Sequence, residues 1–319
     1  MNDGENHIVK PLLSVLIITY NHEKYISDAI ESVLMQKCQY PVEIIIGDDF
    51  SSDKTREICS DYAQKFSNIK LLPSEKNIGI TPNFIRTSQA CTGKYIAMLE
   101  GDDYWTDPYK LQKQVDYLIA NPEFILCFHN RNHQEGNVIS DKLHCDYGQE
   151  KHFIQDEILF ARIHTLTVMF RNILKEHPFP KEFSGLPLYD FALWAYLSLF
   201  GKAAYLDFVG ATYRLHDKGF YSAGETISNY EKWLNCQIVI KKYFPKNYQE
   251  SYNKFILMLN HMLLEELSER KLWGKYSLNM IKLFYRSILA GNYQYINYYN
   301  SFFKTKAKRA IKYLIGIKS

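Results

Sequence analysis

The chain has 319 residues, of which 46% are apolar and 23% charged, as in a folded protein with room for one large α/β domain and an appendage. No apolar stretch approaches the roughly 18 to 20 residues that cross a bilayer, and residues 1–10 lack the apolar core of a secretory signal, so we expect a cytoplasmic protein. Its six cysteines form no Cys-x-x-Cys pair, which argues against a zinc site and against a disulfide framework.

Strand and helix patterns alternate along the first half of the chain. Apolar, β-branched runs predict strands at residues 14–19, 43–47, 69–72 and 95–99. Amphipathic patterns predict helices at residues 26–34, 55–66, 82–90 and 109–120. Because the strands are almost continuously apolar, this alternation predicts a mostly parallel sheet with helices on both faces. Ligands of such sheets bind beyond the carboxyl ends of the strands.

The second half of the chain is less regular. Further strands are expected at residues 124–128, 165–170 and 203–209, and a strongly apolar helix at residues 187–200. Helical patterns dominate from about residue 227. We therefore expect one α/β domain over residues 10–220, followed by a helical C-terminal region over residues 221–319.

Acidic residues follow two of the predicted strands. Asp48 and Asp49 come after the second strand, and Glu100-Gly101-Asp102-Asp103 comes after the fourth. Carboxylates gathered at one edge repel one another, and a Mg²⁺ or Mn²⁺ ion that bridges a diphosphate would compensate that repulsion. The alternative is a pair of turns that use Asp for its turn preference. Acids at both strand ends make that alternative weaker than it is for either pair alone.

Several spaced motifs over residues 12–130 occur in a specific order. They are Thr19-Tyr20-Asn21, Asp48-Asp49-Phe50-Ser51-Ser52-Asp53-Lys54-Thr55, Asn77-Ile78-Gly79, and Gly93-Lys94-Tyr95-Ile96 running into Glu100-Gly101-Asp102-Asp103. As a set they resemble the family-2 glycosyltransferases of the GT-A fold, whose sheet has a Rossmann-like nucleotide-binding half. The resemblance implies an inverting, metal-dependent transfer of a sugar from a nucleoside diphosphate sugar to an acceptor hydroxyl. It suggests a place in cell-surface polysaccharide or lipid-linked saccharide synthesis.

The resemblance also implies roles for the matching positions. Asp49, with Asp48, would contact the nucleobase, because a carboxylate accepts a ring N–H. The positions that would line the rest of the nucleotide-sugar pocket are Thr19, Tyr20, Asn21, Glu23, Asn77, Gly79, Asn83, Glu100 and Asp102. Asp102 and Asp103 match the metal and ribose end of the family's Asp-x-Asp motif. The first acid of that motif is Glu100 here, a departure that leaves its own role open.

An acceptor hydroxyl needs a base as its oxygen attacks the anomeric carbon. Asp190 is the one acid in an otherwise apolar helical segment, and the resemblance places the catalytic aspartate in a similar acid-then-aromatic segment. The alternative is that Asp190 stabilises the first turn of its helix through the helix dipole, with Pro187 at the first helical position.

Two basic side chains follow the strand predicted at residues 203–209. The segment Tyr213-Arg214-Leu215-His216 resembles one that follows the base in this family. It suggests that His216 approaches the metal or the diphosphate and that Arg214 offsets charge on the leaving group. The alternative for His216 is an ordinary hydrogen-bonded loop residue.

The end of the chain is basic, with no Asp or Glu after Glu269. Apolar residues and lysines recur at helical spacing over residues 303–315, which is typical of a helix that lies on an anionic membrane surface. A helix docked on the acidic body and a solvated tail are the alternatives. Nucleic-acid binding is not expected, because no recognised motif accompanies the charge.

Two other function classes remain open at this point. A nucleotidyltransferase would share the sheet and the metal, but it would have a glycine-rich phosphate loop where this chain has Tyr20-Asn21-His22-Glu23. A non-catalytic nucleotide-sugar-binding module would have Asp190 in a core or Asp102 away from the cleft.

Overall fold

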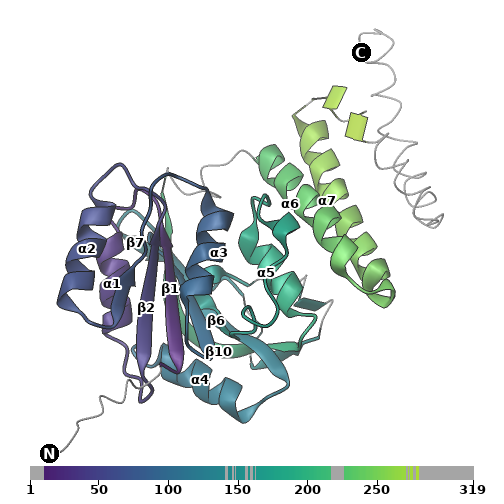
Figure 1. Cartoon of the computed structure of the whole chain (residues 1–319). Coiled ribbons are helices and arrows are strands. Elements are labelled where there is room, and N and C mark those ends of the chain that lie inside the picture. Colours follow the sequence, from purple (N-terminus) through teal and green to yellow (C-terminus); the bar gives the residue numbers. More distant parts are fainter. Residues whose placement is uncertain are drawn as a thin grey trace, which may run out of the picture. The chain divides into compact units, whose positions relative to one another are not determined.

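A computed structural model describes residues 11–216 except 141, 142, 146, 148, 155, 156, 159, 160 and 162, and residues 226–279 except 271, 273, 276 and 277. The chain divides into two compact units, Met1–Ala223 and Gly224–Ser319 (Figure 1). The basic tail predicted to contact a membrane lies outside the described residues.

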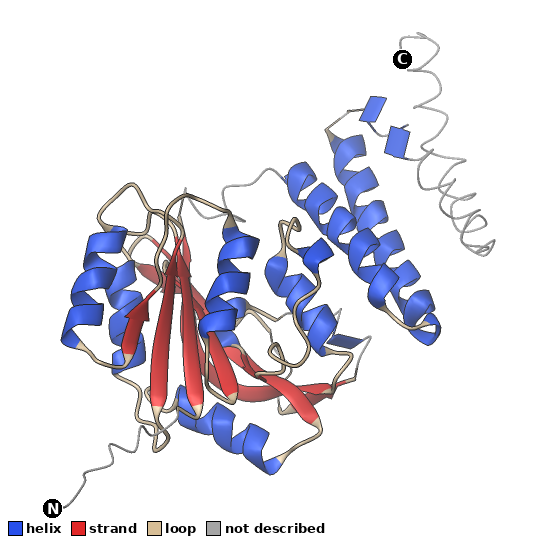
Figure 2. Ribbon diagram, in the orientation of Figure 1, coloured by secondary structure: helices blue, strands red, loops and turns tan. Residues whose placement is uncertain are grey.

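One mixed sheet of ten strands runs through the first unit (Figure 2). Its strand order is β3-β2-β1-β4-β9-β6-β10-β5, with β7 paired to β6 and β8 paired to β10. The strands are β1 (Leu13–Thr19), β2 (Val42–Asp48), β3 (Ile69–Leu71), β4 (Tyr95–Glu100), β5 (Tyr104–Trp105), β6 (Phe124–Glu135), β7 (Val138–Ser140), β8 (Lys151–Phe153), β9 (Met169–Arg171) and β10 (Lys202–Leu215).

Helices cover both faces of the sheet. They are α1 (Ile26–Leu34), α2 (Thr55–Lys65), α3 (Ile80–Ala90), α4 (Lys110–Ala120) and α5 (Tyr189–Leu197). Val15 and Ile17 of β1 share one hydrophobic cluster with Ile30 of α1 and Val115 of α4. On the opposite face α3 lies so close to β2 that a Cβ at Gly47 would come within 2.0 Å of the Thr87 hydroxyl. Every residue of β1 is buried as a result.

The prediction of a sheet flanked by helices is confirmed, and most of its elements lie where the sequence places them. β1, β2, β3 and β4 pair in parallel, as expected. All six cysteines lie within the described residues and none forms a disulfide; all except the half-buried Cys38 are buried, as expected of small core residues.

The prediction of a strand over residues 165–170 is wrong. Thr165–Thr167 form a short 3-10 turn, and the strand is β9, which runs antiparallel between β4 and β6. β6 and β10 extend well past their predicted ends, to Glu135 and Leu215. They pair with each other in parallel over this length, so the polar residues of each extension are held by backbone hydrogen bonds rather than by apolar burial.

The second unit is helical where it is described, as predicted. α6 (Thr226–Ile240) and α7 (Gln249–Glu269) pack against each other. Leu263, Leu264 and Leu267 are buried on α7. Within the described residues, no helix combines the length and the apolar character that a membrane crossing requires.

Candidate active site

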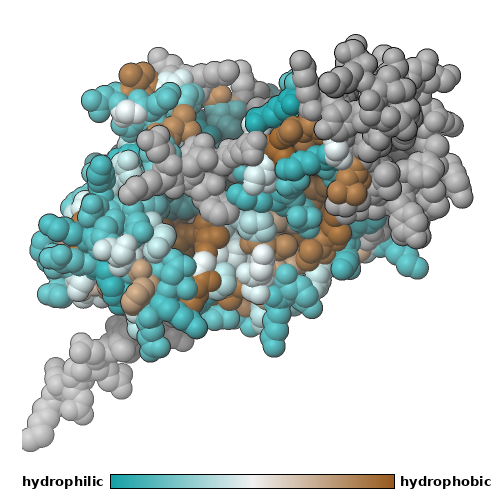
Figure 3. All heavy atoms as spheres, turned by 90° about the horizontal axis from the view of Figure 1, so that it is seen from above, coloured by the Kyte–Doolittle hydropathy of each residue, from teal (hydrophilic) through white to brown (hydrophobic). Residues whose placement is uncertain are grey.

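The carboxyl ends of the parallel strands meet at the upper edge of the sheet in Figure 1. Thr19 lies beside Asp48 in the pairing of β1 with β2, and Ile18 lies beside Glu100 in the pairing of β1 with β4. The predicted strand-end acids therefore share one edge, as the parallel arrangement requires. Seen from above, this face is mainly hydrophilic, with apolar residues gathered near its middle (Figure 3).

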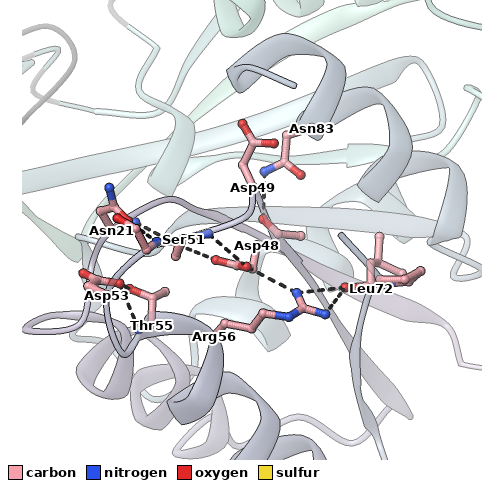
Figure 4. Close-up of polar contacts among 12 residues, drawn as sticks. Asn21, Asp48, Asp49, Ser51, Asp53, Thr55, Arg56, Leu72 and Asn83 are labelled. Atoms are coloured by element: carbon pink, nitrogen blue, oxygen red, sulfur yellow. Dashed lines mark hydrogen bonds and ion pairs between the residues drawn. The ribbon is translucent and has the colours of Figure 1, made fainter. Parts of the chain in front are cut away.

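The Asp48 carboxylate is held inside the fold. It is fully buried, forms a 3.2 Å ion pair with Arg56, and accepts the hydroxyl hydrogen bond of Ser51. The Arg56 guanidinium also reaches the Leu72 carbonyl at 3.4 Å, so it lies between β3 and Asp48 (Figure 4). Asp48 thus fixes the loop after β2, because a buried carboxylate is stable when paired and hydrogen-bonded.

The Asp49 carboxylate lies away from that ion pair, beside Asn83 (Figure 4). Its two oxygens accept the backbone N–H groups of Ile78 and Gly79 at 2.9 and 2.8 Å. Gly79 has φ +91°, which favours glycine, and its neighbours form the turn that starts α3. Asp49 is thereby held in one orientation, and the lone pairs that remain on its oxygens can accept a further N–H.

Asn83 itself is buried and occupied within the chain. Its amide donates to the Gly47 carbonyl at 2.7 Å, and its oxygen accepts from Arg86 at 2.9 Å. Arg86 also donates to the Asp48 carbonyl at 2.6 Å. Arg86 and Asn83 therefore tie α3 to the loop that carries Asp48 and Asp49.

The loop after β1 is tied to the loop after β2. Asn21, at φ +57°, donates its backbone N–H to Ser51 at 2.9 Å, and its side-chain oxygen accepts from the Ser52 N–H at 2.8 Å. Glu23 bonds across the same gap, donating its N–H to Asp53 and accepting from the Lys54 N–H, both at 3.1 Å.

The other predicted pocket positions differ in exposure. Thr19 is buried at the end of β1, whereas Tyr20 is 45% exposed. Asn77 is exposed in the turn before α3. The exposed side chains of Tyr20 and Asn77 are accessible to a ligand from solvent, while Asn21 and Glu23 shape the backbone around them.

Asp102 lies between two histidines. His216 Nε2 is 3.0 Å from Asp102 Oδ2, and His22 Nε2 is 3.6 Å from the same oxygen. Burial opposes ionisation, but the hydrogen bond of His216 and the charges of both histidines outweigh it and lower the pKa of Asp102. Asp102 is therefore an ionised carboxylate with two imidazoles beside it, and carboxylate and imidazole are both ligand types that Mn²⁺ accepts.

Asp103 faces the interior. It is fully buried, its Oδ1 accepts the Arg214 N–H at 2.8 Å, and its Oδ2 has no hydrogen-bond partner among the described residues. Burial, together with the charges of Asp102 and Glu100, raises the pKa of Asp103 well above its ordinary value. Of the two predicted metal aspartates, Asp102 is the more accessible and the more acidic. The described residues contain no preformed group of three or more His, Cys, Asp or Glu side chains that could hold a metal ion.

The Arg214 side chain is fixed by its neighbours. It forms a 2.5 Å ion pair with Asp28, donates to the Asp102 carbonyl at 3.1 Å, and lies over the rings of Tyr25 and Tyr104 at 5.3 and 4.4 Å. These contacts hold the end of β10 against α1 and against the turn after β4. They bring His216, two residues later, to Asp102.

Asp190 lies near the strand-end acids. The residue before it, Tyr189, donates its phenol hydrogen to Glu100 Oε1 at 3.1 Å, which joins the start of α5 to the end of β4. Burial, with the charges of Asp102 and Asp190, raises the pKa of Glu100 to about 8. Burial also raises the pKa of Asp190, while the Phe191 N–H that it accepts at 2.7 Å opposes the shift. Asp190 is half-buried and in the first turn of its helix, as predicted, but the helix begins at Tyr189 and Pro187 lies before it rather than at its first position.

The turn after β4 leaves no space at Gly101. A Cβ there would lie 2.4 Å from the Thr19 hydroxyl and 3.1 Å from His22 Nδ1. We expect Gly101→Ala to push Asp102 away from its histidines at a loss of about 1 to 3 kcal/mol of stability, the usual effect of overpacking. Thermal or denaturant unfolding measures this loss, and the open position Gly185 provides a matched control, Gly185→Ala. Equal stability of the two variants would contradict the close approach.

Two side chains at this edge were not predicted as site residues. In the sequence His22 appears as part of a glycine-free turn, and its place directly after Asn21 at the end of β1 is the signal that marks it. Tyr189 gave no signal, because a tyrosine beside an apolar helix is ordinary core material. Both emerge from pairings between residues 80 or more positions apart.

Comparison with known proteins gives one family. The sequence model described as glycosyl transferase family 2 matches residues 14–177. An uncharacterized protein of Mycobacterium tuberculosis is 34% identical over 219 residues, which are 67% of this chain and 62% of that protein, less than two thirds of its length. TuaG of Bacillus subtilis, assigned by its name to teichuronic acid biosynthesis as a glycosyltransferase, is 32% identical over 50% of this chain and 62% of its own.

The fold has solved counterparts. The mannosyltransferase PcManGT from Pyrobaculum calidifontis, solved with GDP-Man and Mn²⁺, superposes with a TM-score of 0.59 over 97% of this chain and 85% of its own, at 13% identity. This likeness confirms the fold, and the family match spans more than half of the sequence. The resemblance inferred from the motifs is confirmed: the chain belongs to glycosyl transferase family 2.

Proposed function

We propose that the protein transfers a sugar from a nucleoside diphosphate sugar to an acceptor hydroxyl, with inversion at the anomeric carbon. The observation that carries this proposal is the shared edge of the sheet: Glu100 ends β4, Asp49 and Asp102 follow their strands, and Tyr189 joins the helix of Asp190 to Glu100. Family membership supports the same reaction class.

The nucleotide occupies the side of the edge formed by the loops after β1 and β2. Asp49 accepts a ring N–H of the base, and its backbone partners Ile78 and Gly79 keep it oriented for that contact. Tyr20 and Asn77 contact the nucleotide from the exposed side. The remaining predicted positions shape this pocket from behind: Thr19, Asn21, Glu23, Asp48 and Asn83.

A divalent cation, Mg²⁺ or Mn²⁺, would be held by Asp102 and His216, with the diphosphate completing its coordination. The lowered pKa of Asp102 and the imidazole 3.0 Å away support this assignment. When bound, the cation would neutralise the charge that develops on the departing nucleoside diphosphate. The role of Asp103 as a metal ligand stays a prediction, because its carboxylate is buried in the interior.

Asp190 serves as the base. Its half-buried carboxylate takes the proton of the acceptor hydroxyl while the oxygen attacks the anomeric carbon from the face opposite the diphosphate. Its place beside Glu100, at the edge that holds Asp102, supports the enzyme over a binding module. The acceptor that we propose is a growing cell-surface polysaccharide or a lipid-linked saccharide, in line with the name of TuaG. Contact of the basic tail with an anionic membrane stays a prediction from the sequence.

A thermal-shift screen of nucleoside diphosphates and nucleotide sugars, with and without Mn²⁺, tests the proposed function. A donor at 100 times its Kd stabilises the folded state by about 2.7 kcal/mol, which raises the Tm of a domain of this size by about 5 °C or more. We expect such a rise in Tm with the nucleotides of one nucleobase, and we expect the rise to be larger when Mn²⁺ is present. If no nucleoside diphosphate and no nucleotide sugar changes the Tm, the proposal fails.

A further inference from the structure

The position that departs from the Asp-x-Asp pattern of the family, Glu100, contacts the helix that carries the proposed base. Its Oε1 lies 3.1 Å from the Tyr189 phenol oxygen, across 89 residues of sequence. The Thr165 hydroxyl lies close to both side chains and acts to lower the pKa of each. Three segments that are distant in sequence thus meet at the Glu100 carboxylate: the end of β4, the turn before β9 and the start of α5.

Apart from this contact, the start of α5 is held mainly by apolar packing, since Leu188 and Phe191 are buried. Among the described residues, no side chain forms a capping hydrogen bond at Leu188, the residue before the helix. Ser184 and Gly185 are exposed in the preceding loop. The loop is anchored at Leu186, whose carbonyl accepts the Thr81 hydroxyl at 2.6 Å.

Tyr189 provides the anchor inside the helix. It is 2% exposed, and its ring packs on Phe84 of α3 at a centroid distance of 4.9 Å. A phenol buried in this way must donate its hydrogen bond within the protein. Its partner Glu100 is the last residue of the central strand β4. The contact therefore fixes the first turn of α5 relative to the edge of the sheet.

We propose that Glu100 is a positioning residue, which holds Tyr189 and through it the proposed base Asp190 at the edge of the sheet. This inference rests on the proposed function, because it assigns Glu100 an effect through Asp190. The positioning role also explains why residue 100 is a glutamate where the family pattern has an aspartate. An aspartate would withdraw the carboxylate by about 1.5 Å, and the 3.1 Å contact would exceed hydrogen-bond range.

Three variants test the contact by steady-state kinetics. Tyr189→Phe removes the donor and Glu100→Asp shortens the acceptor, so we expect each to lower kcat between about 10- and 100-fold with the donor KM within about twofold of wild type. Glu100→Gln keeps an acceptor oxygen at the same reach and should retain kcat within about threefold. The double variant Glu100→Asp/Tyr189→Phe should be no slower than the slower single variant, because both lose one contact.

Tyr196→Phe is the matched control. It removes a phenol on the same helix that donates to the Pro178 carbonyl at 3.3 Å, away from the acids, and should leave kcat unchanged. Thermal unfolding of every variant separates a fold defect from a positioning defect. A Tyr189→Phe variant with wild-type kcat overturns the inference, as does a Glu100→Gln variant with an increased donor KM, which would indicate direct contact with the donor.

The two proposals fail in different ways. If Asp190→Asn turns over at the wild-type rate, the assignment of the base is wrong, whatever Tyr189 does. If Asp190→Asn is inactive while Tyr189→Phe and Glu100→Asp are fully active, the proposed function stands and the positioning role of Glu100 is rejected.

Discussion

Asp190→Asn is expected to lower kcat on the order of 10³-fold, within the range that a general base contributes. The amide has the shape of the carboxylate and can still accept the Phe191 N–H, but it cannot take a proton from the acceptor. Donor affinity should stay within a few-fold, because the predicted contacts with the nucleoside lie on the loops after β1, β2 and β3. Initial rates at saturating donor, with affinity measured by calorimetry, give both quantities.

The pH dependence of kcat adds a second readout for Asp190. Burial raises the pKa of this carboxyl, so the base is ionised and active above that raised pKa and is lost as the pH falls through it. The acid limb of the profile should therefore lie above the ordinary Asp value of about 3.9. Glu176→Gln, at an exposed acid between β9 and α5, is the control and should leave rate and profile unchanged. A wild-type rate in Asp190→Asn would remove Asp190 from its role.

Asp102→Asn is expected to reduce activity at low Mn²⁺ by about 100-fold and to raise the Mn²⁺ concentration that gives half-maximal rate. The substitution removes the anionic oxygen that lies 3.0 Å from His216 Nε2, and a neutral amide is a much poorer ligand for a hard cation. Initial rates against Mn²⁺ concentration measure the shift. Calorimetry of Mn²⁺ binding in the presence of a nucleoside diphosphate measures it independently of turnover.

Asp103→Asn is the informative comparison for Asp102. Its carboxyl is buried and has a raised pKa, so an amide is close to a neutral substitute for it. We expect a smaller change in Mn²⁺ dependence than in Asp102→Asn. If Asp102→Asn keeps the wild-type dependence of rate on Mn²⁺ while Asp103→Asn shifts it, Asp103 rather than Asp102 is the main metal ligand.

The parallel half of the sheet could be predicted because its strands are buried on both faces and read as continuous apolar runs. Ile44 to Ile46 and Ile96 to Leu99 are examples. The acids after these strands could be placed at one edge for the same reason, since parallel strands end on the same side. Asp190 near the first turn of a helix followed from Pro187 as a helix start, although the helix begins two residues later, at Tyr189.

The rest depended on pairings that local patterns do not encode. β6 and β10 continue through polar residues, such as His133 in β6 and Arg214 in β10. These extensions form because the two strands pair with each other along their whole length. The three-residue β9 has too few positions for a period to identify it or its antiparallel direction. His22 beside Asp102 and Tyr189 on Glu100 arise from the meeting of distant segments, so neither contact could be deduced from spacing.

The central claim is a single displacement at the anomeric carbon, with Asp190 as the base, and the configuration of the product tests it most directly. Proton NMR can follow the sugar formed from the donor identified by the thermal-shift screen, with the acceptor or with water in its place. We predict that the first product formed has the anomeric configuration opposite to that of the donor, and that Asp190→Asn does not form it at a measurable rate. A first product with the configuration of the donor would contradict the account.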